Sequence, residues 1–577
     1  MSVFHALGVS PGFALAPAFV LGRLDADPAQ RTADPASQRP RLEAALEKTR
    51  RDLVSLREKT ALTLGTTQAE IFDAHLSIVS DPELWSLVED HGLEGWDAET
   101  AFYRACQTFI ELLSGLEEEG QRSRADDLRD VRRRLLGHLR GGEGTNGHPL
   151  EPCILVADDL TPSETIGLDL GLVRGFVTAA GSRTSHASIL ARSLGLPSAT
   201  GAAELLTEVR TGQLLALDGQ TGVVIVDPDA DQKRTFQEAQ TADQALRARR
   251  QKYAKLPTRT KDGGALDLAA NIGRLEDLAS VLENGAEGVG LFRTEFLFLD
   301  RDRAPTEDEQ LAVYRHVLET MEGKPVVIRT LDIGGDKVLP YLPLPQEMNP
   351  FLGVRAVRLC FEKPELFRTQ IRALLRASPS GDLRVMVPMV ALVEEVRAVR
   401  KLFDEETSAL KKQGIAVARF QLGIMVEIPA AALNAPALAE EADFFSLGTN
   451  DLIQYTMAAD RMNDRLTHLY QPLHPSLLRL IDLTVKGART RKRWVGVCGE
   501  MASEPEAALL LLGLGVEELS LTASGIPGLR FLLSRVDRKR AAETANLALS
   551  LGTSAQVLAL VKKRHPELED EFQGEAS

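Results

Sequence analysis

Hydrophobic and polar positions follow three different patterns along the chain. Two short runs of strand character, 3–9 and 13–21, open the sequence and are separated by Ser10-Pro11-Gly12. Beyond a linker rich in proline and aspartate, apolar residues recur at helical spacing in four segments. Their apolar positions are Leu42, Leu46, Leu53 and Leu56; Ile71, Phe72, His75, Leu76 and Val79; Phe102, Phe109, Leu112, Leu113 and Leu116; and Leu128, Val131, Leu135 and Leu139. The spacing predicts a four-helix subdomain within 25–145.

Strand character returns after this helical stretch. Four short apolar runs lie at 153–157, 174–179, 214–217 and 223–226. We expect them to join the N-terminal strands in one α/β domain, built from 1–24 and 146–228, with the helical subdomain inserted. Residues 229–258 are polar and rich in Gln, Ala and Arg, which predicts a helical linker.

The C-terminal half, 259–577, alternates short apolar runs with segments of helix length. Eight strand–helix alternations over this length favour a (β/α)8 barrel, and a doubly wound sheet is the alternative. The eight runs are 266–270, 288–292, 326–330, 383–388, 422–426, 444–447, 494–497 and 518–521.

One histidine lies in a turn of small residues. Gly181-Ser182-Arg183-Thr184-Ser185-His186 follows the strand-like run 174–179 and precedes a helix-like stretch that ends at Gly195. A helix start with free N–H groups favours an anion, and a neutral imidazole is a nucleophile that can carry a covalent group. His186 is therefore a candidate carrier of a phosphoryl group; the alternative is a capped helix with a partly buried histidine.

Charged and polar side chains follow the predicted barrel strands. Active sites of such barrels lie at the C-terminal ends of the strands. Arginines there suit phosphate and carboxylate, and a Glu–Asp pair suits Mg²⁺ with substrate oxygens and water. Together these groups fit a small anionic substrate, although a lone cysteine is also often a buried hydrophobe. The residues are Arg293, Arg329, Glu427, Asn450, Asp451, Arg461 and Cys498.

Composition narrows the class of protein. A chain of 577 residues should hold three or four domains, and a net charge of −15 disfavours nucleic acid as the main partner. The N-terminus lacks the pattern of a signal peptide, and no apolar run approaches the length of a membrane span. Cys106, Cys153, Cys360 and Cys498 show neither metal-ligand nor disulfide spacing, which favours the cytosol.

Several long motifs, in order, resemble those of one known family. They are 181-GSRTSHASILARSL-194, 291-LFRTEFLF-298, 329-RTLDIGGDK-337, 349-NPFLGVR-355, 446-SLGTND-451 and 497-VCGE-500. On these motifs the sequence is similar to the enzyme I family of the bacterial phosphoenolpyruvate:sugar phosphotransferase system, the phosphoenolpyruvate–protein phosphotransferases. The resemblance runs nearly end to end.

The resemblance implies a reaction and roles for residues. A swivelling phosphohistidine domain would bring His186 to phosphoenolpyruvate, bound with Mg²⁺ in a TIM-type barrel. His186 would attack the phosphorus, Cys498 would protonate the enolate to give pyruvate, and the phosphoryl group would pass to the carrier protein HPr. The remaining implied roles are metal ligation by Glu427 and Asp451, substrate contact by Arg293, Arg329, Asn450 and Arg461, and less defined positions near the site for Lys337 and Arg355.

The resemblance also implies partners and leaves rival assignments. It places the carrier on the helical subdomain at His75, Ile78, Glu83 and Leu84, and it implies a cytoplasmic homodimer formed through the barrel, without membrane insertion. The nearest alternative is another member of the pyruvate-phosphate dikinase superfamily, such as a nitrogen-branch paralogue with an additional N-terminal sensory domain. A phosphohistidine adaptor without catalysis would need His186 but not the barrel residues.

Overall fold

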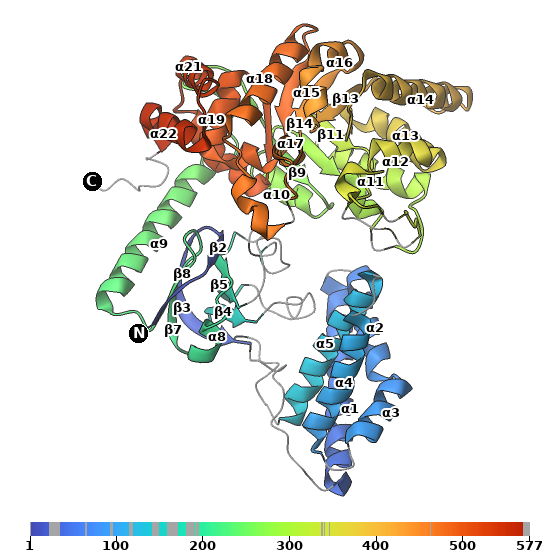
Figure 1. The fold of residues 1–577 in the computed structure, drawn as a ribbon, viewed down its shortest axis with the longest axis vertical. Helices are drawn as coiled ribbons and strands as arrows, with labels where there is room; N and C mark the ends of the chain where they lie inside the picture. The colour runs from blue at the N-terminus through green and yellow to red at the C-terminus, as the bar shows by residue number, and fades with distance from the viewer. Residues whose placement is uncertain are drawn as a thin grey trace. The chain divides into compact units, whose positions relative to one another are not determined.

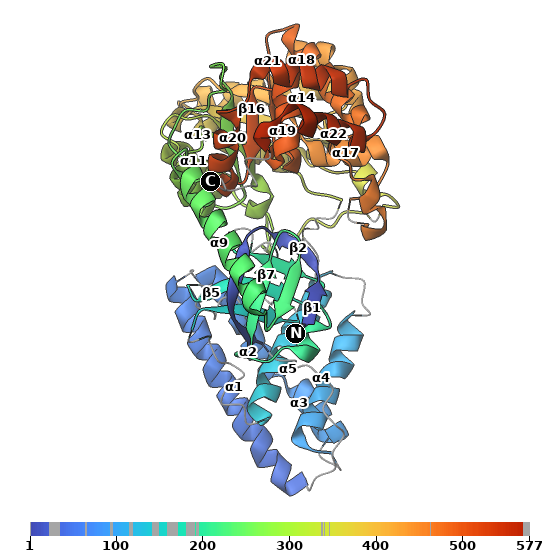
Figure 2. The same ribbon diagram turned by 90° about the vertical axis from the view of Figure 1, so that its left-hand side faces the viewer.

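The chain forms two compact units, Met1–Asp243 and Gln244–Ser577, drawn in Figures 1 and 2. Each unit is described by itself. The computed structural model describes residues 2–21, 35–63, 66–92, 96–114, 119–140, 149, 151–158, 171–179, 188, 191, 195–299, 301–335, 339, 341–345, 347–461 and 463–568.

The first unit contains a curled sheet of eight described strands. Its order is β1-β8-β7-β3-β4-β5-β6-β2. The strands are β1 Ser2–His5, β2 Leu7–Ser10, β3 Phe13–Val20, β4 Cys153–Ala157, β5 Val173–Thr178, β6 Ser198–Thr200, β7 Leu214–Asp218 and β8 Val223–Val226, with the short helix α8 Leu205–Glu208 before β7. Because β1 and β2 lie at opposite edges but only Ala6 separates them in sequence, the sheet must curl until its edges meet.

The prediction of one strand over 3–9 is therefore wrong, because this segment contributes to both edges. The Ala6 N–H donates to the Gly222 carbonyl (2.9 Å), where the chain passes from one edge to the other. Two glycines make this close approach possible. A Cβ on Gly219 would lie 2.0 Å from the Ser10 carbonyl oxygen, and one on Gly222, whose φ is +78°, would lie 2.1 Å from that of Ala6.

Five described helices lie between β3 and β4 in sequence. The four predicted segments correspond to α1 Pro35–Thr63, α2 Thr66–Val79, α4 Ala98–Ser114 and α5 Glu119–Leu139. The structure adds α3 Pro82–Gly92, whose start is fixed by the Asp81 carboxylate accepting from the Glu83 N–H (2.8 Å). The helices run side by side in both views (Figures 1 and 2) and share a core that includes Phe102, Leu128 and Leu135.

The predicted linker contains one long helix, α9 Ala230–Gln251. The boundary between the two units falls inside it. In its N-terminal part, Phe236 meets the ring of Phe13 edge to face, with centroids 6.1 Å apart. Just beyond its C-terminal end, buried Arg530 donates to the carbonyls of Tyr253 (3.0 Å) and Ala254.

The second unit is a closed barrel of eight parallel strands. All eight predicted runs are strands: β9 Asp267–Ile272, β10 Val289–Arg293, β11 Val326–Arg329, β12 Leu383–Val387, β13 Gln421–Val426, β14 Phe444–Leu447, β15 Trp494–Val497 and β16 Glu518–Leu521. Pairing of β16 with β9 closes the barrel and excludes a doubly wound sheet. Strands buried on both faces are continuously apolar, which explains their pattern in the sequence.

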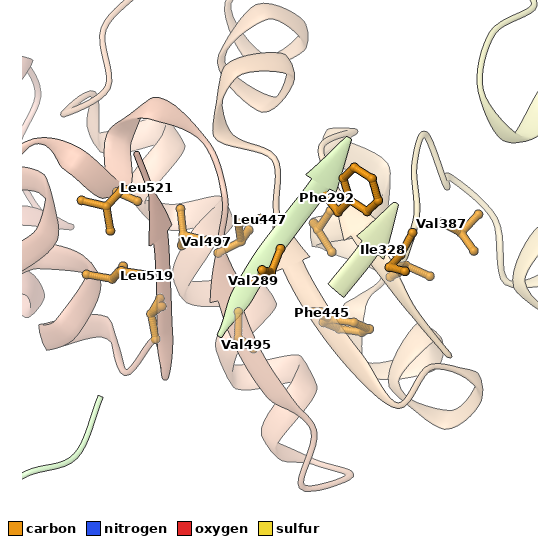
Figure 3. Close-up of a cluster of buried hydrophobic side chains, with 14 of the residues drawn as sticks. Val289, Phe292, Ile328, Val387, Phe445, Leu447, Val495, Val497, Leu519 and Leu521 are labelled. Atoms are coloured by element: carbon orange, nitrogen blue, oxygen red, sulfur yellow. The ribbon is translucent and has the colours of Figure 1, made fainter. Parts of the chain in front are cut away.

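Helices surround these strands (Figures 1 and 2). Apolar side chains from the outer faces of the strands, some of them drawn in Figure 3, form one cluster with the helices. The helices are α10 Asp277–Glu283, α11 Glu307–Thr320, α12 Val357–Glu362, α13 Pro364–Ala377, α14 Val393–Lys412, α15 Pro429–Leu433, α16 Ala435–Glu441, α17 Thr449–Met457, α18 Pro475–Arg489, α19 Pro505–Leu514, α20 Ile526–Leu533, α21 Arg538–Ala548 and α22 Ser554–Arg564. Within the described ranges, no helix is long and apolar enough to cross a membrane.

A second, smaller apolar cluster lies inside the barrel. It comprises Leu291, Val327, Met386, Met425, Phe444 and Cys498, with Trp494 packed against them. The rings of Phe444 and Trp494 stack with centroids 4.5 Å apart. Phe444 has this space because Gly423 opposite has no side chain: a Cβ there would lie 2.5 Å from the Phe444 ring.

Replacing Gly423 by alanine should therefore destabilise the barrel. The added methyl group would overpack the interior, which typically costs about 1–3 kcal/mol. We expect a lower midpoint for the barrel transition in differential scanning calorimetry. Gly552→Ala is the matched control, since its Cβ would approach only the end of the Gln556 side chain at 3.6 Å. Equal unfolding midpoints for the two variants would contradict this account of the barrel interior.

Candidate active site

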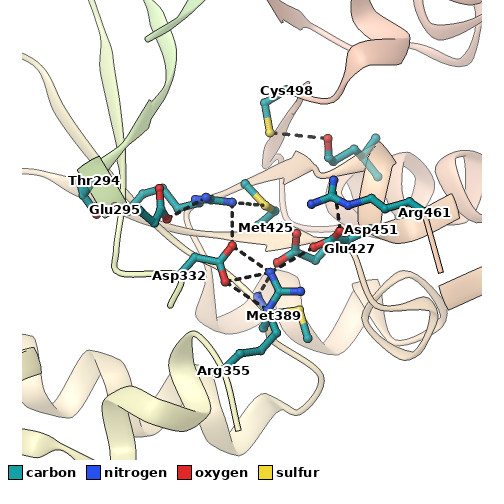
Figure 4. A network of polar contacts seen from close by, with 12 residues as sticks. Thr294, Glu295, Asp332, Arg355, Met389, Met425, Glu427, Asp451, Arg461 and Cys498 are labelled. Carbon is teal, nitrogen blue, oxygen red and sulfur yellow. Dashed lines mark hydrogen bonds and ion pairs between the residues drawn. The ribbon is translucent and has the colours of Figure 1, made fainter. Parts of the chain in front are cut away.

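Side chains from five strand ends meet at the C-terminal rim of the barrel. Glu295 follows β10, Arg329 ends β11, Glu427 follows β13, Asp451 lies in the first turn of α17 after β14, and Cys498 follows β15. Figure 4 labels Glu295, Glu427, Asp451 and Cys498 around a common centre. Parallel strands in a closed barrel bring residues that are far apart in sequence to one site.

An alternating series of charges crosses this rim. Arg329 lies between Glu295, at 2.7 Å, and Asp332, at 3.1 Å. The same Asp332 carboxylate accepts from Arg355 Nη2 with both oxygens, at 2.9 and 3.1 Å. Arg355 Nη2 also lies 3.4 Å from Asp451 Oδ2. All five side chains are buried, so each charge depends on its neighbours in the series.

The carboxylates keep the buried guanidinium groups charged. Burial alone would lower the pKa values of Arg329 and Arg355, but Glu295 and Asp332 raise the first, and Asp332 and Asp451 raise the second. Sequence reasoning did not assign roles to Glu295 and Asp332. Their signal was present: each lies two or three residues beyond an arginine at the end of a predicted strand.

Glu427 and Asp451 form a pair of buried carboxylates. Glu427 Oε1 accepts from the Met389 N–H (2.6 Å), and Gly448 makes room for Glu427 Oε2, since a Cβ there would lie 2.9 Å from it. Asp451 Oδ1 has no hydrogen-bond partner, and Arg461 Nη1 lies 3.6 Å away. Burial, together with the charges of Asp451 and Asp332, raises the pKa of Glu427.

These two carboxylates fit a divalent cation. Two buried carboxylates side by side favour an added positive charge, and Asp451 Oδ1 accepts no hydrogen bond that would take its place. Among the described residues, no group of three or more His, Cys, Asp or Glu side chains is arranged to hold a metal. Glu427 and Asp451 can supply part of an Mg²⁺ shell, and water and substrate oxygens would complete it.

Cys498 lies where the charged rim meets the apolar interior of the barrel. Its Sγ is 3.7 Å from the Leu447 carbonyl oxygen, and its own carbonyl accepts from Asn271 Nδ2 (3.2 Å). Burial raises the pKa of the Cys498 thiol to about 11, although Ser446 and Arg329 act in the opposite direction. The thiol is therefore protonated at neutral pH and can donate a proton. Cys498 is thus buried, as a small hydrophobic residue would be, and it also lies at the edge of the site.

Two arginines and one amide line the open side of the rim. Arg293 and Arg461 are exposed, which leaves them accessible to an anion. The Arg461 N–H donates to Gln454 Oε1 (3.0 Å). Asn450 is half-buried, and its Oδ1 accepts from the Tyr470 hydroxyl at 3.0 Å.

The charged series and the groups beside it contain equal numbers of arginines and carboxylates. Four arginines, at 293, 329, 355 and 461, accompany four carboxylates, at 295, 332, 427 and 451. A divalent cation at Glu427 and Asp451 would leave the site with a net positive charge. The arrangement then suits an anion such as a phosphate ester that also carries a carboxylate.

Two predicted site residues cannot be placed. His186 and Lys337 lie outside the described residues, so the structure gives no contacts for them.

The structure corrects part of the predicted carrier-docking surface. The imidazole of His75 is buried, with Nε2 3.3 Å from Asp127 and Nδ1 3.8 Å from Asp130, and Leu84 belongs to the helical core. Neither side chain can face a carrier, because helical packing turns both of them inward. Of the four residues, Glu83 is exposed and Ile78 is half-buried.

Comparison with known proteins defines the class. Residues 5–124, 149–222 and 247–538 match, in turn, the N-terminal, mobile and PEP-binding domains of PEP-utilising enzymes. The chain is 46% identical to a phosphoenolpyruvate-protein phosphotransferase of Geobacillus stearothermophilus over 97% of both chains. Proteins of the same name from Bacillus subtilis (strain 168) and Listeria innocua are 45% and 46% identical over 98% and 96% of this chain, and over 100% and 98% of their own lengths. The chain therefore belongs to the phosphoenolpyruvate-protein phosphotransferase family.

Without metal, Glu427→Gln should stabilise the protein at alkaline pH. A glutamate whose pKa is raised by folding binds more protons folded than unfolded, so stability falls as pH rises from about 4.3 through the folded pKa. The gain should be about 1–3 kcal/mol near pH 8.5 and smaller near pH 5. Unfolding in urea with a chelator measures it.

Glu440→Gln is the control for this experiment, because Glu440 is exposed and pairs with Arg491 on the surface. This control should show no gain in the free energy of unfolding that grows with pH. If Glu427→Gln were destabilising by the same amount at both pH values, the electrostatic conflict between the carboxylates would be disproved.

Proposed function

We propose that this chain takes the phosphoryl group of phosphoenolpyruvate onto His186 and passes it to a histidine of an HPr-type carrier. Pyruvate is released, and the transfer is the first step of the sugar phosphotransferase system. Membership of the family supports the reaction. The observation that carries the proposal is the barrel rim, where exposed arginines, two buried carboxylates and a protonated thiol lie together.

Each group at the rim has a place in this reaction. Arg293, Arg329, Asn450 and Arg461 bind the phosphate and carboxylate of the substrate, and Arg355 keeps Asp332 and Asp451 in position. Glu427 and Asp451 hold Mg²⁺. When bound, the cation neutralises charge on the phosphoryl oxygens. We also assign Lys337 to the surroundings of this site, from the family motif alone.

The chemical step transfers one phosphoryl group and one proton. A nitrogen of the His186 imidazole forms a bond to phosphorus while the bond from phosphorus to the enolate oxygen breaks. The enolate carbon then takes the proton of the Cys498 thiol, which gives pyruvate and leaves a thiolate. A thiol among apolar side chains is suited to this role, because burial keeps it protonated until the carbanion forms.

The parts of the chain divide the work. Residues 1–24 and 146–228 carry His186, and residues 259–577 bind phosphoenolpyruvate. The helical subdomain, 25–145, docks the carrier through a surface that includes Glu83 and Ile78. The segment 229–258, with α9, connects the barrel to the domain that carries His186. The family resemblance further supports a cytoplasmic homodimer formed through the barrel, which sedimentation analysis tests.

Substitutions of His186 and Cys498 should block different steps of the reaction. After incubation with phosphoenolpyruvate and Mg²⁺, the wild-type chain should carry acid-labile phosphate and His186→Ala should carry none. Cys498→Ala should lose most turnover to pyruvate. Its His186 should still exchange a phosphoryl group with the carrier.

Cys106→Ala is the control, since this cysteine is also buried but lies in α4, in the helical core of the first unit. Label retained in His186→Ala would refute the assignment of the phosphorylated residue. Wild-type pyruvate release by Cys498→Ala would return that cysteine to a packing role.

Metal and substrate should bind together. Because Glu427 and Asp451 supply only part of the coordination shell, Mg²⁺ affinity should rise at least about tenfold when phosphoenolpyruvate is present. Calorimetry should show that this gain disappears in Glu427→Ala/Asp451→Ala. A double substitution of the exposed Glu440 and Glu543 should keep it. Equal Mg²⁺ binding by both double variants would exclude the proposed metal site.

A further inference from the structure

Two hydrogen bonds connect the segment 458–470, which carries Arg461, to α17. On one side, the Arg461 N–H donates to Gln454 Oε1 (3.0 Å). On the other, the Tyr470 hydroxyl donates to Asn450 Oδ1 (3.0 Å). Asn450 and Gln454 are four residues apart, so they lie on the same face of α17. Arg461 therefore depends on this face for its position.

Asn450 Oδ1 also accepts from a third segment. The Glu500 N–H donates to it at 3.1 Å, two residues beyond Cys498 in sequence. A backbone N–H can only donate, so the side-chain atom facing it must be the oxygen and not the amide nitrogen. The two donors fill the two lone pairs of Oδ1. These two hydrogen bonds therefore define which side of the Asn450 amide is the oxygen.

We propose that Tyr470 is a positioning residue: with the Glu500 N–H, it fixes the Asn450 amide so that Nδ2 donates to an oxygen of the anionic substrate. This inference rests on the proposed function, in which Asn450 contacts phosphoenolpyruvate. With its oxygen occupied, Asn450 offers the substrate only donors. It therefore selects an oxyanion and rejects a group that would itself donate a hydrogen bond.

Tyr470 is suited to hold this orientation. Its ring is half-buried, and burial, together with the charges of Glu500 and Glu504, raises the pKa of its hydroxyl. The hydroxyl therefore stays protonated, and remains a donor, at neutral pH. The same contact connects the helix that carries Asp451 with the segment that carries Arg461, while Glu500 connects it to the segment of Cys498.

The test begins with Tyr470→Phe in the full-length chain, assayed for pyruvate release with Mg²⁺ and carrier. The substitution removes one hydrogen bond, worth about 1 kcal/mol. KM for phosphoenolpyruvate should rise about fivefold, and kcat should change less than about twofold. Tyr341→Phe is the matched control. Its hydroxyl donates to the Phe298 carbonyl (2.8 Å) in the same unit but does not contact Asn450, so KM should stay unchanged.

A double-mutant cycle separates positioning from a general structural role. If Tyr470 acts through Asn450, Tyr470→Phe should have no further effect on KM in an Asn450→Ala background. If it only stabilises the segment, the fivefold effect should persist there. Asn450→Asp adds a second criterion: Tyr470 and Glu500 would hold one carboxylate oxygen and turn the other toward the substrate. Affinity for phosphoenolpyruvate, measured by calorimetry, should then fall further than in Asn450→Ala.

The outcomes distinguish this inference from the function on which it rests. No pyruvate release by the wild-type chain would overturn both. Wild-type turnover with unchanged KM in Tyr470→Phe, or additive effects in the cycle, would overturn the positioning role alone. If Tyr470→Phe does not fold, as judged by circular dichroism, the comparison of Asn450→Asp with Asn450→Ala decides, and equal affinities would reject the proposal.

Discussion

The site depends on buried opposite charges that neutralise one another. Glu295, Arg329, Asp332, Arg355 and Asp451 alternate in sign across the barrel rim, at separations of 2.7–3.4 Å. Removing charges from water costs several kcal/mol per ion, and only close opposite charges offset it. Asp332 is the central member, because its loss would take one carboxylate from both Arg329 and Arg355. The series therefore holds the strand ends in one geometry before any ligand arrives.

That series also decides how far each arginine is exposed to a ligand. Arg329 and Arg355 are buried against carboxylates at 2.7 and 2.9 Å, whereas Arg293 and Arg461 are exposed, with Arg461 3.6 Å from Asp451. At Glu427, burial and the charges of Asp451 and Asp332 outweigh the nearby arginines and raise its pKa, so an added positive charge is favoured there. The same rim can thus bind a cation at its carboxylates and an anion at its exposed arginines, side by side.

Cys498 lies between two environments, an apolar cluster below it and the charged rim above it. The side chains clustered with Cys498 below the rim are apolar, among them Phe444, Met425 and Leu291, and burial there disfavours a thiolate. Above it, the charged side chains favour a phosphorylated substrate. One residue at this boundary can therefore stay protonated while it lies beside a highly charged ligand. The closed barrel makes such a boundary possible, because its interior excludes water and its rim does not.

The sequence by itself determined the elements and most of the site. Eight apolar runs became eight strands, and Arg329, Glu427, Asp451 and Cys498 meet because parallel strands end on one side. Periodicity reports which residues are apolar and how often they recur, but not which edge or partner each segment meets. Only the tertiary structure split 3–9 between two edges of a sheet, turned His75 and Leu84 inward, and placed Glu295 and Asp332 beside arginines. It also fixed the Asn450 amide through Tyr470 and Glu500, because contacts between residues distant in sequence depend on strand register and loop path.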